Sequence, residues 1–286
     1  MDSPERLSFR GDGITLVADA AGPRAGLPVL FLHGSGQTRH SWRKALREAA
    51  ARGFRAIALD LRGHGDSEPS PDGLYTADLL IADIRSVVTQ IGRPPVVVGA
   101  SIGGLVGMAL AASPPPALRA VVLVDITPQP EPEGIEEVRG FMASAQNGFA
   151  SLDEAADAVA AYLPHRARPK DTSGLARNLR LREGRYHWHW DPAFFFQMAG
   201  EPNHIAKSIR LMTRAAEQLT IPTLLIRGGS STVVSEAGAR AFLALVPHAD
   251  YANIAGAHHM VAGDANDAFN EAVFAFLDKH GAASQA

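Results

Sequence analysis

Apolar residues along this chain follow two alternating patterns. A short continuous apolar run, typical of a strand buried on both faces of a sheet, occupies residues 27–34, and further strands are predicted at 54–60, 94–101, 117–125, 222–227 and 250–256. Stretches with the apolar spacing of helices occupy residues 40–53, 76–92, 102–113, 235–246 and 264–280. Because strands and helices alternate through short connections, we predict a parallel sheet with helices on both faces.

The N-terminal segment departs from this alternation. Residues 5–20 contain two short alternating runs around Gly11-Asp12-Gly13, which predicts a β-hairpin. Further along, Thr76 stands directly before a predicted helix and is a candidate N-cap, and Gly53 directly after another helix suits a C-terminal cap.

The alternation also stops between residues 128 and 217, where no convincing core strand is found. Two stretches in this segment, 151–163 and 203–219, have the spacing of amphipathic helices. We therefore predict two units. A core domain comprises residues 1–128 and 218–286, and a mainly helical cap, residues 129–217, is inserted between its two parts.

Composition and charge narrow the range of partners. Of 286 residues, 46% are hydrophobic and 20% are charged, and the formal net charge is −3, so no basic surface for nucleic acid or anionic lipid is expected. No apolar run approaches the roughly 18 residues of a membrane span, and the N-terminus lacks the apolar segment of a signal peptide. Cysteine is absent, which excludes disulfides and thiolate chemistry. We expect a cytoplasmic protein.

The strongest chemical signal is the segment GASIG, residues 99–103, between an apolar run and a helix. It has the G-x-S-x-G pattern of a nucleophile elbow, in which small neighbours allow the chain to turn sharply and lift the serine above the sheet edge. Ser101 would then lie at the N-terminus of the following helix, where negative charge is favoured. The alternative is an incidental glycine-rich turn.

The segment HGSG, residues 33–36, supplies a second element of the same chemistry. A nucleophilic serine requires two N–H donors for the oxyanion that forms during the reaction. We expect these donors to be the backbone amides of Ser35 and of Ile102, the residue after the serine. His33 is interpreted as a structural hydrogen-bonding residue, and His33 and Gly34 are grouped with the expected substrate pocket.

Together these motifs resemble those of α/β-hydrolases. The resemblance covers nearly all of the chain outside the cap and rests on HGSG, DLRGHGDS, GASIGG, LVDITP and GAHHMV, in that order. It implies a mostly parallel, doubly wound sheet with an inserted, mainly helical cap. It also implies that DLRGHGDS shapes a turn, so Asp60, His64 and Asp66 are not interpreted as catalytic.

The resemblance places the general base on a late loop, three residues after a glycine. Gly256 plus three is His259, so His259 is the predicted base. The adjacent His258 is the alternative. Because neighbouring side chains on a loop cannot both face Ser101 in the same way, one of the two histidines is expected to be a bystander.

The acid of the triad is missing from the place where the resemblance expects it. A motif R-G-G-x-S-D would put aspartate at position 232, which is Thr232 here. Threonine accepts a hydrogen bond but cannot stabilise an imidazolium ion. Asp125, after the strand that follows the nucleophile helix, occupies another position used for the acid in such enzymes. One alternative is that Asp125 only caps the turn before Pro128, and another is that the triad has no carboxylate acid. Glu236 and Asp250 are also near in sequence, but Glu236 begins a predicted helix and Asp250 begins a predicted strand.

The aromatic cluster of the cap, residues 186–196, invites two further interpretations. His187 and His189 alternate like a metal pair, but a third ligand with metal spacing is missing. Trp188, Trp190 and Phe195 are expected either to line an apolar substrate pocket or to form the core of the cap. No metal and no cofactor is predicted.

The residue at the elbow separates reaction classes. Epoxide hydrolases and haloalkane dehalogenases carry aspartate at this position, so Ser101 argues against both. A serine predicts acyl transfer to water, with a small carboxylic, lactone or aryl ester as substrate. Carbon–carbon bond hydrolysis and perhydrolysis remain alternatives within the enzyme class. A catalytically retired protein that binds a ligand in the same pocket is the alternative outside it, and Thr232 is the one feature in its favour.

Overall fold

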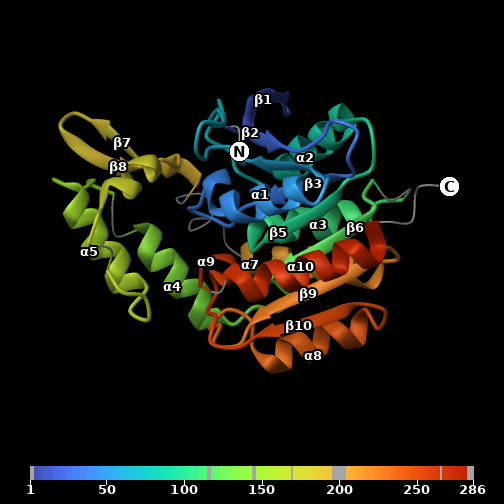
Figure 1. Ribbon diagram of the computed structural model, residues 1–286. Coiled ribbons are helices and arrows are strands. Elements are labelled where there is room, and N and C mark those ends of the chain that lie inside the picture. The colour runs from blue at the N-terminus through green and yellow to red at the C-terminus, as the bar shows by residue number, and fades with distance from the viewer. Residues whose placement is uncertain are drawn as a thin grey trace.

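The computed structural model describes residues 3–114, 117–143, 146–168, 170–194, 204–264 and 266–281. Its centre is an eight-stranded sheet in the order β1-β2-β4-β3-β5-β6-β9-β10 (Figure 1). The pairs β1–β2 and β2–β4 are antiparallel and the other neighbours are parallel. The strands are β1 (Glu5–Arg10), β2 (Thr15–Ala21), β3 (Pro28–Leu32), β4 (Arg55–Leu59), β5 (Val96–Ala100), β6 (Ala120–Val124), β9 (Thr223–Gly228) and β10 (Asp250–Ile254). The predicted hairpin and mostly parallel sheet are confirmed.

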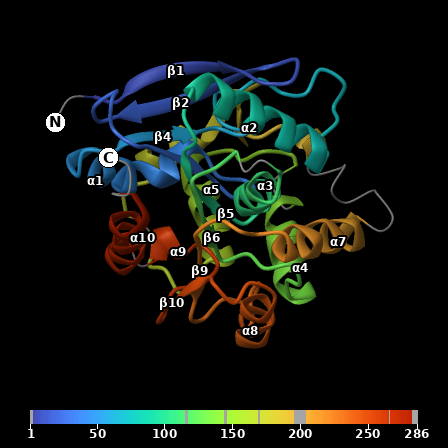
Figure 2. The ribbon, with the colours of Figure 1, turned by 90° about the vertical axis from the view of Figure 1, so that its right-hand side faces the viewer.

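Helices cover both faces of the sheet (Figure 2). One face packs against α1 (Arg43–Ala51) and α10 (Asn266–Gly281), where aromatic residues such as Trp42 and Phe269 fill the space between the layers. The other face packs against α2 (Ala77–Ile91), α3 (Ile102–Ala111) and α8 (Glu236–Leu245). Side chains of successive strand residues point to opposite faces, so the continuous apolar runs supply both layers.

The helix ends follow local chemistry. Thr76 caps α2 by accepting a hydrogen bond from the Leu79 amide, and Gly92 ends that helix in the left-handed region. The helix predicted from residue 40 instead begins as a 3-10 turn, η1 (Arg39–Trp42), which Thr38 caps, and continues as α1. A short helix, α9 (Val261–Asp264), precedes α10.

The segment between β6 and β9 adds no strand to the central sheet among its described residues. It contains α4 (Pro132–Ala143), α5 (Leu152–Tyr162), η2 (Ser173–Asn178), a two-stranded sheet of β7 (Leu179–Arg182) and β8 (Arg185–Trp188), and α7 (His204–Glu217). Helix α4 and the β7–β8 hairpin were not predicted. Figure 1 shows α4, α5 and the hairpin beside the core.

The domain boundaries at residues 128 and 218 stay a prediction. Helix α7 packs Met212, Ala215 and Ala216 into the same apolar cluster as α2 and α3. By contrast, Phe149, Trp188 and other residues of the segment belong to a smaller apolar cluster, which Tyr75 joins from the loop before α2. No helix in the described ranges is long and apolar enough to cross a membrane.

Candidate active site

Ser101 occupies a strained turn between β5 and α3. Its backbone has φ 48° and ψ −115°, a conformation that non-glycine residues rarely adopt. The turn is this tight because the chain approaches itself closely. A Cβ atom on Gly99 would lie 2.4 Å from the Gly103 carbonyl oxygen, and one on Gly103 would lie 2.5 Å from the Leu32 carbonyl oxygen. Glycine is therefore required on both sides of Ser101, as a nucleophile elbow demands.

The loop after β3 lies against this turn. A Cβ atom on Gly34 would be 3.4 Å from the Ser101 Cβ, and Ser35 lines the same cavity as Ser101. Ile102 is the first residue of α3, so its N–H has no acceptor within the helix. Among the described residues, neither the Ser35 nor the Ile102 amide donates a hydrogen bond. Their role as an oxyanion hole stays a prediction.

Asp125 and His259 are hydrogen-bonded to each other. Asp125 directly follows β6, is completely buried and has φ 50°. The His259 Nδ1 donates to the Asp125 Oδ2 at 2.8 Å. The other carboxylate oxygen, Oδ1, accepts from the Gly228 amide at 2.9 Å. With its proton on Nδ1, the ring leaves Nε2 available as an acceptor, which is the tautomer that a general base requires.

Ser231 holds this carboxylate and was missed in the sequence. Its hydroxyl donates to Asp125 Oδ2 and accepts from the amides of Val233 and Val234, both at 3.1 Å. The R-G-G-x-S part of the expected motif contained the signal, because its serine is Ser231. Thr232 points elsewhere: its side chain is exposed and donates to Glu137 Oε2 at 2.7 Å.

The other candidates are engaged away from His259. The His258 ring stacks on His165 with 3.6 Å between ring centroids, and its amide donates to Asp264 at 2.9 Å. Glu236 pairs with Arg240 on the surface of α8, and Asp250 pairs with Lys279. The structure therefore brings Asp125, and neither of the other two carboxylates, to the late histidine.

The DLRGHGDS segment builds a buried hydrogen-bond network. Asp60 is completely buried, accepts from the Arg39 amide at 2.7 Å and also pairs with the Arg39 guanidinium. His33 Nε2 accepts from the Leu61 amide at 3.0 Å, and His64 Nε2 accepts from the Gly36 amide at 3.2 Å. Burial lowers the pKa of His33 to about 4 and that of His64 to about 3. Both rings are neutral at neutral pH and support the loop that carries Ser35.

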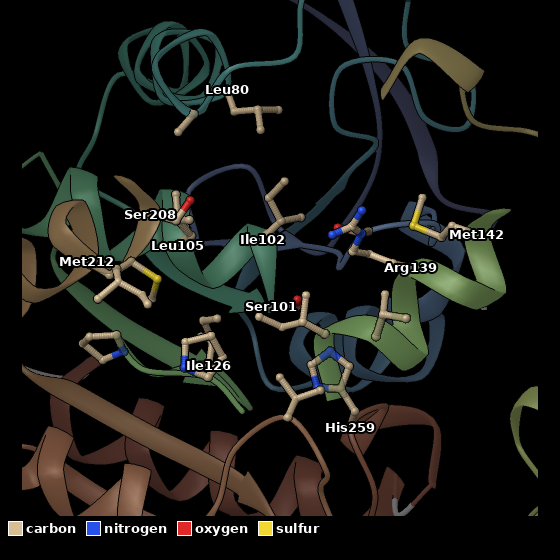
Figure 3. Close-up of a pocket in the computed structure, with 18 of the residues that line it drawn as sticks. Leu80, Ser101, Ile102, Leu105, Ile126, Arg139, Met142, Ser208, Met212 and His259 are labelled. Carbon is tan, nitrogen blue, oxygen red and sulfur yellow. The ribbon is translucent and has the colours of Figure 1, made fainter. Parts of the chain in front are cut away.

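An apolar cavity opens beside Ser101 and His259 (Figure 3). Its volume of about 160 Å³ suits a small molecule. Its apolar walls come from α2, α3, α4 and α7, and include Leu80, Ile102, Leu105, Ile126, Met142 and Met212. A smaller adjoining cavity shares Ser101 and His259 and is lined by Gly34 and Tyr162.

Of the residues expected to form the substrate pocket, some line the cavities beside Ser101 and others do not. Gly34 lines the smaller cavity, whereas His33 lines neither cavity. Trp188 and Trp190 also line neither; their rings stack with 5.0 Å between centroids inside the apolar cluster of the cap. A Cβ atom on Gly36, in the loop that carries Ser35, would lie 3.4 Å from the Trp190 ring. A role of either tryptophan in the substrate pocket therefore stays a prediction. Phe195 lies outside the described residues.

The histidines of the aromatic cluster are not joined by a metal-type arrangement. His189 Nδ1 accepts a hydrogen bond from the Gly65 amide at 2.8 Å, and the His187 ring lies against Gly148. Within the described ranges, no group of three or more histidine and acidic side chains is placed to hold a metal ion.

The sheet order, the elbow after β5 and the late histidine loop are those of hydrolases built on a doubly wound sheet. The model of the alpha/beta hydrolase fold family matches residues 28–265. The chain therefore belongs to the α/β-hydrolase family.

Known relatives support a hydrolase. An esterase of Mycobacterium tuberculosis is 33% identical over 216 residues, which cover 73% of this chain and 68% of the esterase. An sn-1-specific diacylglycerol lipase of Mus musculus is 28% identical over 265 residues, which cover 87% of this chain and 80% of the lipase. The crystal structure of an E-2-(acetamidomethylene)succinate hydrolase superposes with a TM-score of 0.82 at 26% identity, covering 96% of this chain and 100% of that one.

Proposed function

We propose that the protein is a serine hydrolase that cleaves a small carboxylic ester through an acyl-enzyme on Ser101. The observation that carries this proposal is the 2.8 Å hydrogen bond between His259 Nδ1 and Asp125 Oδ2. It supplies a buried carboxylate to the late histidine, which compensates for the threonine at position 232. The same contact weakens the argument for a retired binding protein, since that argument rested on Thr232 alone.

The reaction begins with proton transfer. His259 Nε2 takes the proton of the Ser101 hydroxyl as Oγ attacks the ester carbonyl, and Asp125 stabilises the imidazolium that forms. The amides of Ser35 and Ile102 donate to the oxyanion. No hydrogen bond joins Ser101 to His259 within the described residues, and catalytic contacts of this kind commonly tighten only when substrate binds.

The second half of the reaction releases the acid. His259 returns its proton to the departing alcohol, and the acyl group stays on Ser101. A water molecule then gives a proton to His259 Nε2 as its oxygen attacks the acyl carbon. The bond from this carbon to Ser101 Oγ breaks, and His259 returns the proton to Oγ, which frees the carboxylic acid and restores the serine hydroxyl. This sequence requires no metal and no cofactor.

The substrate class follows from the cavity. Its walls are mainly apolar and its volume is small, so a short acyl or aryl ester fits better than a long-chain lipid. An esterase and a diacylglycerol lipase among the relatives agree with ester chemistry. Lactone hydrolysis uses the same steps and stays within the proposal.

Two measurements on the same variants test the proposal. Hydrolysis of p-nitrophenyl butyrate and labelling by a fluorophosphonate are compared for the native protein, Ser101→Ala and Ser113→Ala. Ser113, beyond the other end of α3, is the matched control. We expect Ser101→Ala to lose labelling and about 10³–10⁵-fold in kcat, and Ser113→Ala to resemble the native protein. Labelling of Ser101 without turnover would mean that the substrate belongs to another class. The absence of both labelling and turnover would contradict the proposal that the protein is an enzyme.

A further inference from the structure

Arg139 of α4 is the unusual residue of the larger cavity. The cavity wall is otherwise apolar or hydroxyl-bearing, apart from His259. Among its described lining residues, Arg139 alone carries a permanent charge, and no carboxylate lines the cavity with it. Figure 3 shows the guanidinium of Arg139 turned toward the cavity that Ser101 and His259 also line.

The guanidinium is only partly satisfied by its neighbours. Arg139 Nη1 donates to Glu136 Oε1 at 2.9 Å. Nε is buried and has no hydrogen-bond partner, and Nη2 donates to none of the described residues. Nε and Nη2 form one edge of the guanidinium, and the two parallel N–H groups of such an edge match the two oxygens of a carboxylate.

Nearby carboxylates leave this edge open. Glu136 is the more exposed member of its pair with Arg139, at 65% against 32%, so it holds the guanidinium from the solvent side. Glu137, the next acidic residue, accepts from Thr232 instead. The positive charge of Arg139 is therefore neutralised on one edge and unpaired on the other.

We propose that Arg139 determines specificity by binding an acidic group of the substrate. The natural ester then carries a carboxylate, on its acyl or its alcohol part, in the larger cavity. This inference rests on the proposed ester hydrolysis at Ser101 and adds the charge of the substrate to it. Binding the carboxylate at a fixed distance from Ser101 would also orient the scissile bond.

The test compares acidic and neutral esters of matched size. The p-nitrophenyl monoester of glutaric acid is paired with p-nitrophenyl pentanoate, which places the charge on the acyl part. The ester 4-acetoxybenzoate is paired with 4-methylphenyl acetate, which places the charge on the alcohol part. For each pair the measured quantity is the ratio of kcat/KM for the acidic ester to kcat/KM for the neutral one, after subtraction of spontaneous hydrolysis.

Four variants report on this ratio. We expect Arg139→Gln to lower it about 10–100-fold for one of the pairs, Arg139→Lys to keep part of it, and Glu136→Gln to raise it by freeing the guanidinium. Arg240→Gln is the matched control, because Arg240 also pairs with a glutamate of the preceding helical turn but lies on the surface of α8. Its ratio should equal that of the native protein.

The outcomes separate this inference from the proposed function. If Arg139→Gln leaves the ratio unchanged for both pairs, because acidic and neutral esters lose the same or nothing, the role of Arg139 is overturned while ester hydrolysis stands. A native protein that cleaves none of the four esters and is not labelled at Ser101 would overturn the proposed function itself.

Discussion

Replacing Asp125 by asparagine tests the triad most directly. The carboxylate is completely buried and accepts hydrogen bonds from the Gly228 amide, the Ser231 hydroxyl and His259 Nδ1. Asparagine has nearly the same shape, so the packing around the site should persist. Its amide group, however, removes the negative charge and can present N–H donors to Nδ1, which favours the wrong tautomer of His259.

The size of the loss distinguishes two roles for Asp125. A neutral hydrogen bond that merely orients the ring contributes about 0.5–1.5 kcal/mol, or at most about tenfold in rate. Stabilising the imidazolium with a buried charge contributes more, and we expect kcat to fall about 10²–10⁴-fold, equivalent to about 3–5 kcal/mol. A loss in kcat below tenfold would therefore mean that Asp125 only orients the ring of His259.

The assay is steady-state hydrolysis of p-nitrophenyl butyrate, with circular dichroism and urea unfolding to verify the fold. Thr232→Val is the matched control: the side chain of Thr232 faces Glu137, so its kcat should stay within about threefold of native, as for surface changes away from a site. Equal turnover by native protein and Asp125→Asn, with both folded, would refute the reasoning. A large loss in Thr232→Val would show instead that the contact of Thr232 with Glu137 supports the site.

Three further predictions concern the support of the site. Ser231→Ala should lower kcat about 3–10-fold and stability by about 1 kcal/mol, with Ser231→Thr restoring part of the rate; an unchanged rate would leave Ser231 without a positioning role. Gly99→Ala should destabilise by at least about 1–3 kcal/mol in urea unfolding, because the new Cβ would lie 2.4 Å from a backbone oxygen of α3, whereas Gly140→Ala, in open space on a helix, should stabilise by about 0.5–1 kcal/mol. Equal effects of the two would contradict the close-approach argument. Burial lowers the pKa of His33 to about 4 and of His64 to about 3, so the unfolded chain binds these protons first; stability should fall as pH drops below about 6.5, by up to about 1.4 kcal/mol per pH unit for each histidine, and urea midpoints that do not change between pH 7 and 4.5 would refute this.

The core of the fold was predictable because its patterns have local causes. Strand β5 buries nearly all of its five residues on both faces, which requires a continuous apolar run. Helix α2 begins after a threonine cap and ends at a left-handed glycine. The elbow was readable from its G-x-S-x-G pattern, because Gly99 is required by a contact with Gly103, two residues beyond Ser101.

The segment between β6 and β9 was less predictable because several of its elements bury little. Helix α4 buries only Gly134 and Met142 among its described residues, so its apolar spacing is weak. Strand β7 reads LRLR and leaves Leu181 64% exposed. Arg139 had no signal in the sequence, since its interest depends on α4 lining the same cavity as Ser101.

The position of the acid depends on which strands are neighbours. Strands β6 and β9 lie side by side, with Val124 paired to Ile226, and the Asp125 amide donates to the Ile226 carbonyl at 2.7 Å. The carboxylate of Asp125 then bonds to the amide of Gly228, at the end of β9. The side chain of Asp125, at the end of β6, thus reaches the start of the loop that follows β9. An acid placed after β9 would extend from this same loop.

A triad acid at either strand end would therefore suit the same histidine loop. Because both strand ends meet at one point of the sheet edge, a carboxylate from either can accept the Nδ1 proton of His259. If Asp125 is the acid, as we propose, position 232 is free to contact α4, and Thr232 does so through Glu137. Ser231, the serine of the R-G-G-x-S pattern, donates to the Asp125 carboxylate at this point. A search for the acid should accordingly follow the strand neighbours of the sheet and not the order of motifs along the chain.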